Sequence, residues 1–543
     1  MMASTSTTNP STSSSSTPPT PLPPPIVWTI AGSDSGGGAG IQADLLAFHS
    51  LGCHGCSVIT ALTAQNSNQV RKVETSSLAM LRTTLATLED DMPAKAVKLG
   101  MLATAEVVGE VGDFLAQKAA NGSLGPVVCD PVMVTTSGSV LLDEGARRIM
   151  IDRVFPHATL ITPNKHEAEV LVGYRLKTPQ DVERAARDVM AMGNSRAVLV
   201  KGGHSLDSDE EKREGEEEES FDATVAQDYF LERDSTQGMW ITSPRLQNLN
   251  THGTGCTLSS AVAAFLAQDL PLEDAVVLAK AYVSQGIRAA IQLGHGPGPV
   301  QQTGWPASPP DFPWVSICAE EGSDAKRSGP FAACEREIGL YACVDSAAWV
   351  QRLLDLGVRD IQLRIKDRPA GELDIEVREA AESCRKVQAR LWVNDYWELA
   401  LRYQTYGLHI GQEDLEGLLT APDQPLTAIQ RGGVRLGIST HTFTELGRAV
   451  ALRPSYISLG PIFPTASKKI NFGPQGLARL KQWRRLVDVP LVAIGGIGIE
   501  AVPAVQKAGA DGICVISALT KASDLAEAVK EWQGVCGISK LTK

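Results

Sequence analysis

The sequence predicts an α/β protein of two domains: a three-layer α/β/α domain with a mainly parallel sheet, followed by a (β/α)8 TIM barrel. Two observations lead to this fold class. Strand-like apolar runs alternate with helix-length segments over about 270 residues of the N-terminal half, as in a parallel sheet covered on both faces. Eight short apolar runs then recur in about 200 residues, most of them with room for a helix before the next, as in a barrel.

Residues 1–25, which precede the first strand-like run, are rich in Ser, Thr and Pro and carry no charged side chain. Such a segment cannot bury an apolar core, so we expect it to be disordered. It has no apolar h-region, which excludes a secretory signal. Its serine content and lack of acidic residues are typical of an organellar transit peptide, although the first Lys or Arg of the chain is Arg71 and transit peptides normally contain arginine.

The first domain is expected to span residues 26–295 and to open with a strand that enters the glycine-rich turn 36–40. This turn is not a P-loop, because no Gly-Lys-Ser/Thr follows it. A turn that lets backbone approach a small ligand is the better interpretation. Near the end of the domain, Asn250–Thr257 feeds an apolar helix, and such helix N-termini bind phosphate through free N–H groups. Three further buried-type strands end in polar residues: Val127–Met133, Leu160–Glu167 and Ala197–His204.

Three segments are expected to lie outside the two domain cores. Residues 207–222 are mainly acidic, which indicates a solvated loop inserted between strands. Residues 296–335 contain many Pro, Gly and Ser and are expected to link the domains, and residues 536–543 to form a tail.

The barrel is expected to span residues 336–535, with an active site at the carboxyl ends of its strands. Its apolar runs are rich in Val, Ile and Leu, as strands covered on both faces should be. The runs are Tyr341–Asp345, Ile361–Asp367, Leu391–Asp395, Gly407–Asp414, Val434–Thr442, Tyr456–Lys469, Leu491–Ile497 and Asp511–Ser517.

The ends of these runs carry polar groups of complementary kinds. Fixed cations and carboxylates suit Mg²⁺ held together with phosphate oxygens, and glycine turns after the last two strands are where barrels commonly bind a phosphate. The set therefore predicts a substrate phosphate and a magnesium-held pyrophosphate. Its members are Arg364, Lys366, Asn394, Asp395, Asp414, Ser439, Thr465, Ser467, Lys468, Gly495, Gly496, Ile516 and Ser517.

The motifs QLRIKD, LWVND, GLHIGQED, GISTHT, GPIFPTASKK and VAIGGI occur in an order that resembles the thiamine-phosphate synthase family. That family joins the pyrimidine of hydroxymethylpyrimidine diphosphate to thiazole phosphate and releases pyrophosphate. The resemblance implies that the diphosphate is bound by Gln362, Arg364, Lys366 and Asn394, with Mg²⁺ on Asp395 and Asp414. It implies contacts to the departing pyrophosphate or the thiazole phosphate from Ser439, Thr465, Ser467 and Lys468, and a thiazole phosphate cradle at Gly496, Ile516 and Ser517. Arg364 and Lys468 would be catalytic, and Ser467 keeps the hydroxyl where many relatives have Thr.

In the first half, AGSD, GAGIQAD, CDPVM, TPNKHE, KGGH and HGTGCT occur in an order that resembles the ribokinase-like superfamily, and within it hydroxymethylpyrimidine and hydroxymethylpyrimidine-phosphate kinases. The resemblance implies pyrimidine contacts from Gly32, Asp44, Gln65 and Met101. It implies that Asp130 and Glu167 organise Mg²⁺, and that Lys201, Thr254 and Asn164 bind ATP. Gly253, Thr254, Gly255 and Cys256 would form the anion hole at the transferred phosphoryl group.

Cys256 stands where sugar kinases of this superfamily have a catalytic Asp. A thiolate at a helix N-terminus has a lowered pKa, so Cys256 is expected either to accept the hydroxymethyl proton in the first phosphorylation or merely to pack. If it is the base, Cys256→Ala should impair the first phosphorylation more than the second, because the second acceptor is already an ionised phosphate.

These features together predict a bifunctional enzyme of thiamine biosynthesis that uses Mg²⁺ and ATP. Three alternatives remain open: a pyridoxal-type kinase fused to a thiazole tautomerase-like barrel, a sensor that binds thiamine precursors without turnover, and a structural scaffold. A tautomerase needs no pyrophosphate site, a sensor needs no magnesium ligands, and a scaffold needs neither. Similar fusions occur as plastid proteins in plants and algae, so the resemblance favours a plastid location, with the cytoplasm as the alternative.

Composition narrows the classes of partner. A net charge of −12 disfavours nucleic acid as a general partner. There is no run of 18 apolar residues to span a membrane. The ten cysteines are scattered over 543 residues, which favours a reducing compartment. Small-molecule substrates are the expected partners, and both resembled families commonly form homo-oligomers.

Overall fold

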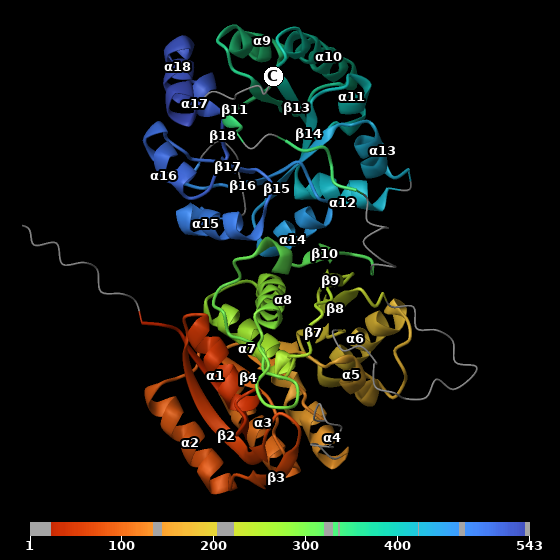
Figure 1. Ribbon diagram of the computed structural model, residues 1–543, viewed down its shortest axis with the longest axis vertical. Coiled ribbons are helices and arrows are strands. Elements are labelled where there is room, and N and C mark those ends of the chain that lie inside the picture. The colour runs from red at the N-terminus through yellow and green to blue at the C-terminus, as the bar shows by residue number, and fades with distance from the viewer. Residues whose placement is uncertain are drawn as a thin grey trace, which may run out of the picture.

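The computed structural model describes residues 23–133, 144–202, 222–319, 329–334, 337–421, 423–465 and 473–537. Two α/β domains lie one above the other along the longest axis of the molecule, with the N-terminal domain below in Figure 1. Both have the predicted fold class. Most of the leader, nearly all of the acidic stretch and most of the tail lie outside the described residues, so the expectations for those segments stay predictions.

Ten strands form the single sheet of the N-terminal domain: β1 (Ile26–Asp34), β2 (His54–Gln65), β3 (Val70–Thr75), β4 (Ala96–Leu99), β5 (Val127–Cys129), β6 (Leu160–Ile161), β7 (Ala197–Val200), β8 (Val225–Glu232), β9 (Met239–Pro244) and β10 (Trp314–Ser316). Their order is β10-β9-β8-β7-β6-β5-β4-β1-β2-β3. The strands from β7 to β2 are parallel, and antiparallel strands extend both edges. The carboxyl ends of the parallel strands therefore meet along one edge, where the predicted site residues lie.

Helices cover both faces of this sheet: α1 (Gly40–Ser50), α2 (Leu78–Asp91), α3 (Ala105–Ala120), α4 (Glu144–Arg153), α5 (Lys165–Val172), α6 (Pro179–Gly193), α7 (Thr254–Ala267) and α8 (Leu272–Arg288). Successive residues of β1 enter two separate cores. Val27 packs in a cluster with α1, α7 and α8, whereas Trp28 packs in a cluster with α2 to α6. The three-layer prediction is confirmed.

Eight parallel strands close the C-terminal barrel: β11 (Gly339–Val344), β12 (Asp360–Leu363), β13 (Arg390–Asn394), β14 (Gly407–Ile410), β15 (Arg435–Thr440), β16 (Tyr456–Leu459), β17 (Leu491–Ile494) and β18 (Gly512–Val515). The surrounding helices are α9 (Ala347–Asp355), α10 (Ala370–Lys386), α11 (Trp397–Arg402), α12 (Gln412–Thr420), α13 (Pro425–Arg431), α14 (Phe443–Ala451), α15 (Gly476–Leu486), α16 (Val502–Lys507), α17 (Ser517–Thr520) and α18 (Leu525–Cys536). β18 pairs with β11, so the predicted barrel is confirmed.

The segment expected to link the domains packs against both of them. Its strand β10 pairs antiparallel with β9, with Val315 opposite Ile241. Val315 also meets Gly447 of α14, where an added Cβ would lie 2.7 Å from the valine side chain. One apolar cluster thus runs from α7 and α8 through Phe312 and Val315 into the outer layer of the barrel, at the junction seen in Figure 1. In the described parts of the chain, no helix combines the length and the apolar character needed to cross a membrane.

Candidate active sites

The glycine-rich turn after β1 is organised by Asp34, a residue that the sequence analysis did not single out. Its carboxylate accepts backbone N–H groups from Gly36 (2.8 Å), Gly38 (3.1 Å) and Ala39 (2.9 Å), and lies 3.2 Å from His252 Nε2. Burial opposes ionisation, but the bonds from His252 and the backbone hold the pKa of Asp34 below its usual value. An ionised Asp34 therefore fixes the turn and ties it to the segment before α7.

Gly253 brings the anion-hole turn directly against the glycine-rich turn. It caps α7 with φ +79°, and an added Cβ would lie 1.9 Å from the carbonyl oxygen of Gly38. The first N–H groups of α7 have no acceptor within the helix and carry its positive dipole end. The two turns therefore lie in contact beside the free backbone N–H groups at the start of α7.

Lys201, Asp130 and Gly255 converge at this helix N-terminus. Lys201 Nζ lies 2.8 Å from Asp130 Oδ1. An added Cβ on Gly255 would lie 3.2 Å from Lys201 Nζ and 3.5 Å from Asp130 Oδ2. The absence of a side chain at Gly255 leaves room beside the lysine and the carboxylate at the anion hole.

Glu167 stands near the same group on α5. Its carboxylate accepts from the backbone N–H of Asn164, whose side-chain oxygen accepts from Glu167 N, both at 2.8 Å. Burial, opposed by Lys201 and reinforced by the charge of Asp130, raises the pKa of Glu167 to about 7. Two buried carboxylates that repel each other are a donor set that Mg²⁺ fits. The side-chain oxygen of Asn164, expected at ATP, is engaged in this helix cap.

The expected pyrimidine contacts divide into an accessible group and a buried residue. An added Cβ on Gly32 would lie 2.4 Å from Met101 Cε, so these two residues meet, and Gln65 is part-exposed at the end of β2. Asp44 has no exposed surface. Its carboxylate accepts bonds from Lys98 (2.8 Å), Thr29 (2.6 Å) and Ser260 (2.7 Å). The carboxylate of Asp44 therefore already accepts hydrogen bonds from three neighbouring side chains in this structure.

The expected lowering of the Cys256 pKa is wrong. Burial raises the pKa of this thiol to about 11, although the nearby Lys98 ammonium and the Gly40 backbone N–H act in the opposite direction. The charges of Asp44 and Asp130 add to the effect of burial. A neutral thiol at the anion hole is the state that this arrangement favours.

In the barrel, Asp395, Asp414 and Lys366 meet above β13. Asp395 follows the strand with φ +68° and lies 2.5 Å from Lys366 Nζ. Asp414 stands in the first turn of α12. Burial, a hydrogen bond with Asp395 and repulsion by its charge raise the pKa of Asp414 to about 6, although Lys366 opposes the shift. Two carboxylates that compete for one ammonium suit a hard cation; the described residues contain no cluster of three or more His, Cys, Asp or Glu that would hold one.

A chain of hydrogen bonds crosses the barrel interior and joins two predicted site residues. Ser439 Oγ lies 2.9 Å from His409 Nε2, and His409 Nδ1 lies 2.6 Å from Tyr456 OH. Tyr456 OH lies 3.0 Å from Tyr341 OH, to which Gln362 Nε2 donates at 3.3 Å. The sequence analysis missed both tyrosines. The only feature of the sequence that could have indicated them is their position in the strands, where their side chains face the barrel interior.

The predicted phosphate cradle is only partly described. Gly495 and Gly496 have φ +94° and +66°, and Phe463 N donates to Gly495 O at 3.0 Å, so the loop after β16 lies on this turn. Ile516 precedes α17, which begins at Ser517. Thr465 is part-exposed in the same loop. Ser467 and Lys468 lie outside the described residues. Asn394 is buried at the end of β13, and Arg364 is part-exposed just beyond β12.

A family model for phosphomethylpyrimidine kinase matches residues 34–301, and one for thiamine monophosphate synthase matches residues 340–519. The chain is 33% identical over 528 residues to the chloroplastic thiamine biosynthetic bifunctional enzyme TH1 of Arabidopsis thaliana, with 93% of each chain covered. The chain belongs to this family of thiamine biosynthetic bifunctional enzymes. It is an enzyme of thiamine biosynthesis with a phosphomethylpyrimidine kinase domain followed by a thiamine-phosphate synthase domain.

Two further comparisons each match part of the bifunctional enzyme. The thiamine-phosphate synthase of Salmonella paratyphi B is 49% identical over 202 residues, which is 37% of this chain and 93% of that one. A pyridoxal kinase structure from Staphylococcus aureus, in complex with AMP-PCP and pyridoxal, is 30% identical with a TM-score of 0.44, covering 52% of this chain and 94% of that one. The synthase match favours the synthase over the tautomerase-like alternative for the barrel.

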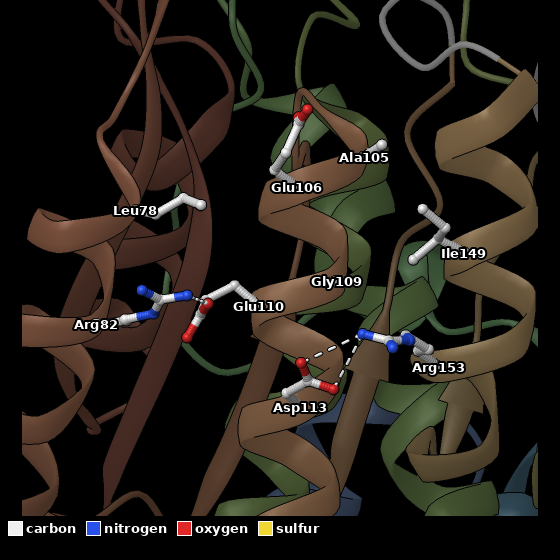
Figure 2. A pocket seen from close by; sticks show the side chains of 9 residues that line it. All are labelled: Leu78, Arg82, Ala105, Glu106, Gly109, Glu110, Asp113, Ile149 and Arg153. Atoms are coloured by element: carbon white, nitrogen blue, oxygen red, sulfur yellow. Dashed lines mark hydrogen bonds and ion pairs between the residues drawn. The ribbon is translucent and has the colours of Figure 1, made fainter.

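A groove of about 420 Å³ on the kinase domain is lined by residues other than the proposed site residues. Figure 2 shows it between α2, α3 and α4. Four of its five charged side chains form two ion pairs, Arg82 with Glu110 and Arg153 with Asp113.

The raised pKa of Cys256 predicts a slow reaction with iodoacetamide near neutral pH. Less than one thousandth of the thiol is ionised about three units below its pKa, so the alkylation rate should rise about tenfold per pH unit between about pH 7 and 9. Mass spectrometry of the Cys256 peptide measures that rate, with the exposed Cys318 as the internal comparison. An alkylation rate that reached a plateau near pH 7 would show an ionised Cys256 and would support its role as the base. With a neutral thiol, Cys256→Ala should impair both phosphorylations alike.

The Asp395–Asp414 pair predicts that Mg²⁺ binding to the synthase domain depends on pH. The pKa of Asp414 is raised to about 6, so a proton competes with the cation below that pH and affinity should fall about tenfold per unit. The Mg²⁺ concentration for half-maximal synthase activity, measured between about pH 5 and 8, checks this. Asp395→Asn should move the dependence to lower pH by removing the repelling charge. An affinity that stays constant across this range would contradict the coupling.

Proposed function

We propose that the kinase domain transfers phosphate from ATP to hydroxymethylpyrimidine and then to its monophosphate, and that the barrel condenses the resulting diphosphate with thiazole phosphate. One observation carries the proposal. Each domain gathers two mutually repelling carboxylates and a lysine at its strand ends, Asp130, Glu167 and Lys201 in one and Asp395, Asp414 and Lys366 in the other. Both sites are thus prepared for polyphosphate with a divalent cation.

In the kinase reaction, positioning and neutralisation of charge are the main requirements. Lys201 is proposed to reach the phosphates of ATP, and Asp130 and Glu167 to hold Mg²⁺. The N–H groups at Gly253 to Cys256 would receive the transferred phosphoryl group at the positive end of α7. When bound, Mg²⁺ would neutralise phosphate charge at this place.

The pyrimidine is proposed to lie between Gly32, Met101 and Gln65. Asp44, whose carboxylate accepts bonds from Lys98 and Ser260, is proposed to contact the pyrimidine as well. A neutral Cys256 can pack against the hydroxymethyl group without taking its proton. In a loose transition state that proton can leave late, to an oxygen of the transferred phosphoryl group, as the new O–P bond forms and the bond to the leaving ADP breaks.

In the synthase reaction, negative charge accumulates on the departing pyrophosphate. Lys366, Arg364 and Asn394 are proposed to stabilise that charge, together with Mg²⁺ on Asp395 and Asp414. The resemblance assigns Gln362 to the diphosphate and Ser439 to the pyrophosphate or the thiazole phosphate. The interior hydrogen-bond chain links these two residues, and we propose that they also orient the pyrimidine ring. We keep the assignments of Thr465, Ser467 and Lys468 to the phosphates, and of Gly496, Ile516 and Ser517 to the thiazole phosphate cradle, as proposals.

The cellular setting follows from the family. The Arabidopsis relative is named as chloroplastic, which supports a plastid location for this enzyme. We propose small molecules as its substrates and a homo-oligomer as its assembled state.

A single incubation tests the proposal. Purified protein receives hydroxymethylpyrimidine, thiazole phosphate, ATP and Mg²⁺, and thiamine phosphate is measured, with pyridoxal replacing the pyrimidine in a parallel tube. Formation of thiamine phosphate supports both reactions in their order. If ATP is consumed but no thiamine phosphate forms, the assignment of the barrel as a synthase fails. If ATP is consumed only with pyridoxal, the assignment of the kinase substrate is overturned.

A further inference from the structure

The barrel helix α14 takes part of its N-terminal cap from the kinase domain. Asp274, in the first turn of α8, accepts bonds from Thr444 N at 2.8 Å and Thr444 Oγ1 at 2.9 Å. The backbone N–H of Phe443 also donates to it. Asp274 is 3% exposed and Thr444 is 2% exposed. A helix N-terminus that belongs to one domain is thus capped by a carboxylate of the other, inside the interface.

This cap satisfies donors that α14 does not satisfy itself. The N-cap residue Thr442 uses its Oγ1 to accept from Glu445 N at 3.1 Å, which leaves the N–H groups of Phe443 and Thr444 to Asp274. Burial raises the pKa of Asp274, and the bonds from Thr444 and Phe443 oppose that shift. Removing the carboxylate would leave buried N–H groups without an acceptor, which is costly.

The capped helix begins directly after the strand that carries Ser439. At the end of this strand, Thr440 Oγ1 donates to Ser458 O at 2.9 Å and accepts from Trp483 Nε1 at 2.9 Å. The next residue, His441, is held by Glu445 of α14, whose Oε2 accepts from the histidine N at 2.6 Å. A shift of the first turn of α14 would therefore displace the end of β15 and its Ser439 hydroxyl.

An aromatic series makes the same connection through side-chain packing. Phe265 of α7 lies 5.0 Å from Trp305, and Trp305 lies 6.3 Å from Phe443, measured between ring centroids. Phe443 lies 4.4 Å from Trp483, the residue bonded to Thr440. The helix that forms the kinase anion hole is thus packed, through one continuous series of rings, to the strand end of the synthase site.

We propose that Asp274 is a positioning residue of the synthase reaction, supplied by the kinase domain. It acts by holding the β15–α14 turn, and with it Ser439, in the geometry that orients the pyrimidine. The proposal rests on the synthase chemistry proposed above. The Salmonella synthase matches only 37% of this chain, whereas in this chain the barrel takes part of the support of this turn from outside its own fold.

The test compares full-length variants in two separate assays. Synthase turnover is measured with hydroxymethylpyrimidine diphosphate supplied directly, and kinase turnover with hydroxymethylpyrimidine and ATP. Asp274→Ala should lower synthase kcat/KM about tenfold, because the Ser439 hydroxyl would no longer be held in position, and leave kinase turnover within about twofold. Asp274→Asn keeps an acceptor and should retain synthase kcat/KM within about threefold. Thr444→Val removes only the hydroxyl bond and should lose two- to threefold.

Asp181 provides a matched control, because it caps a helix within the kinase domain alone. Its carboxylate accepts from Thr178 N and Thr178 Oγ1, both at 2.9 Å, at the start of α6. Asp181→Ala should therefore lower stability without changing synthase turnover. If Asp181→Ala reproduced the synthase loss, or if Asp274→Ala left synthase kcat and KM unchanged, the positioning role would be overturned.

Hydrogen–deuterium exchange of residues 439–445 gives a readout that needs no activity. Exchange there should become faster in Asp274→Ala than in the wild type and in Asp181→Ala. An unchanged exchange rate would overturn the proposal even if turnover fell. If the wild-type protein made no thiamine phosphate, the synthase proposal would fail separately, and faster exchange would still establish the cap as the support of this turn.

Discussion

Asp395→Ala should lower synthase turnover by about 10²- to 10³-fold and leave kinase turnover unchanged, the scale expected for loss of one group that stabilises developing charge. Asp395 is the point where Lys366 and Asp414 meet, at 2.5 Å from the lysine Nζ. Without it, the proposed cation loses a ligand and Lys366 loses the partner that holds its ammonium over the strand ends. Synthase turnover is measured as thiamine phosphate formed from supplied hydroxymethylpyrimidine diphosphate and thiazole phosphate. Kinase turnover is measured as ATP consumption.

Glu413→Ala is the matched control for this variant. Glu413 is an exposed carboxylate beside Asp414, and its charge contributes to the raised pKa of Asp414. Its removal deletes the same charge from the same region without deleting a proposed ligand, so synthase turnover should stay within about threefold. Equal losses in the two variants would show that general negative charge, rather than the position of Asp395, is what the site requires. A parallel loss of kinase turnover in Asp395→Ala would contradict separate active sites.

The barrel site was predictable because chain order determines position in this fold. Lys366, Asp395 and Asp414 each follow an apolar run, and in a parallel barrel the ends of all such runs meet on one face. Their convergence in the structure therefore required no long-range information beyond the periodic pattern. The same reasoning predicted that Lys201 and Asp130 lie close together, because they directly follow the parallel strands β7 and β5. Their charged groups lie 2.8 Å apart.

The ionisation of Cys256 was not predictable, because it depends on burial that no local pattern records. The sequence shows a thiol at a helix N-terminus, which alone predicts a lowered pKa. The fold places Asp44 and Asp130 close to it and leaves it only part-exposed, and these effects outweigh Lys98. The hydrogen bonds of Asp44 were unpredictable for a related reason. The resemblance implies a pyrimidine contact for this residue, which stays a prediction, and a lysine 54 residues away already bonds its carboxylate.

The contact between Asp274 and Thr444 illustrates a second limit. The two residues are 170 positions apart and lie in different domains. Each looks ordinary in its own helix, an acidic residue in a first turn and a threonine beside a cap. Similarly, residues 314–316 stand in a stretch rich in Pro, Gly and Ser, yet they complete a sheet because β9 offers an open edge. Pairing across a domain boundary leaves no periodic signal in either partner.

Gly253→Ala should lower turnover of the kinase by at least about 10²-fold while leaving the synthase unchanged. Two independent constraints require glycine at this position. Its φ of +79° costs an alanine roughly 1–2 kcal/mol, and the added Cβ would lie 1.9 Å from the carbonyl oxygen of Gly38. Backbone cannot rotate away as a side chain can, so the two turns must separate, and a displacement of about 1 Å at a reacting centre costs about 10²-fold. Separate kinase and synthase assays measure the outcome.

Gly37→Ala separates the steric clash from the backbone strain. Gly37 lies in the same turn with φ +76°, and an added Cβ there meets nothing within 4 Å. Both variants should therefore lose a similar amount of stability from the left-handed conformation, but only Gly253→Ala should force the anion hole open. If Gly37→Ala lost as much kinase turnover as Gly253→Ala, strain in the turn would explain the effect. A loss confined to Gly253→Ala would mean that the close approach of the two turns is what places the N–H groups of α7 at the transferred phosphoryl group.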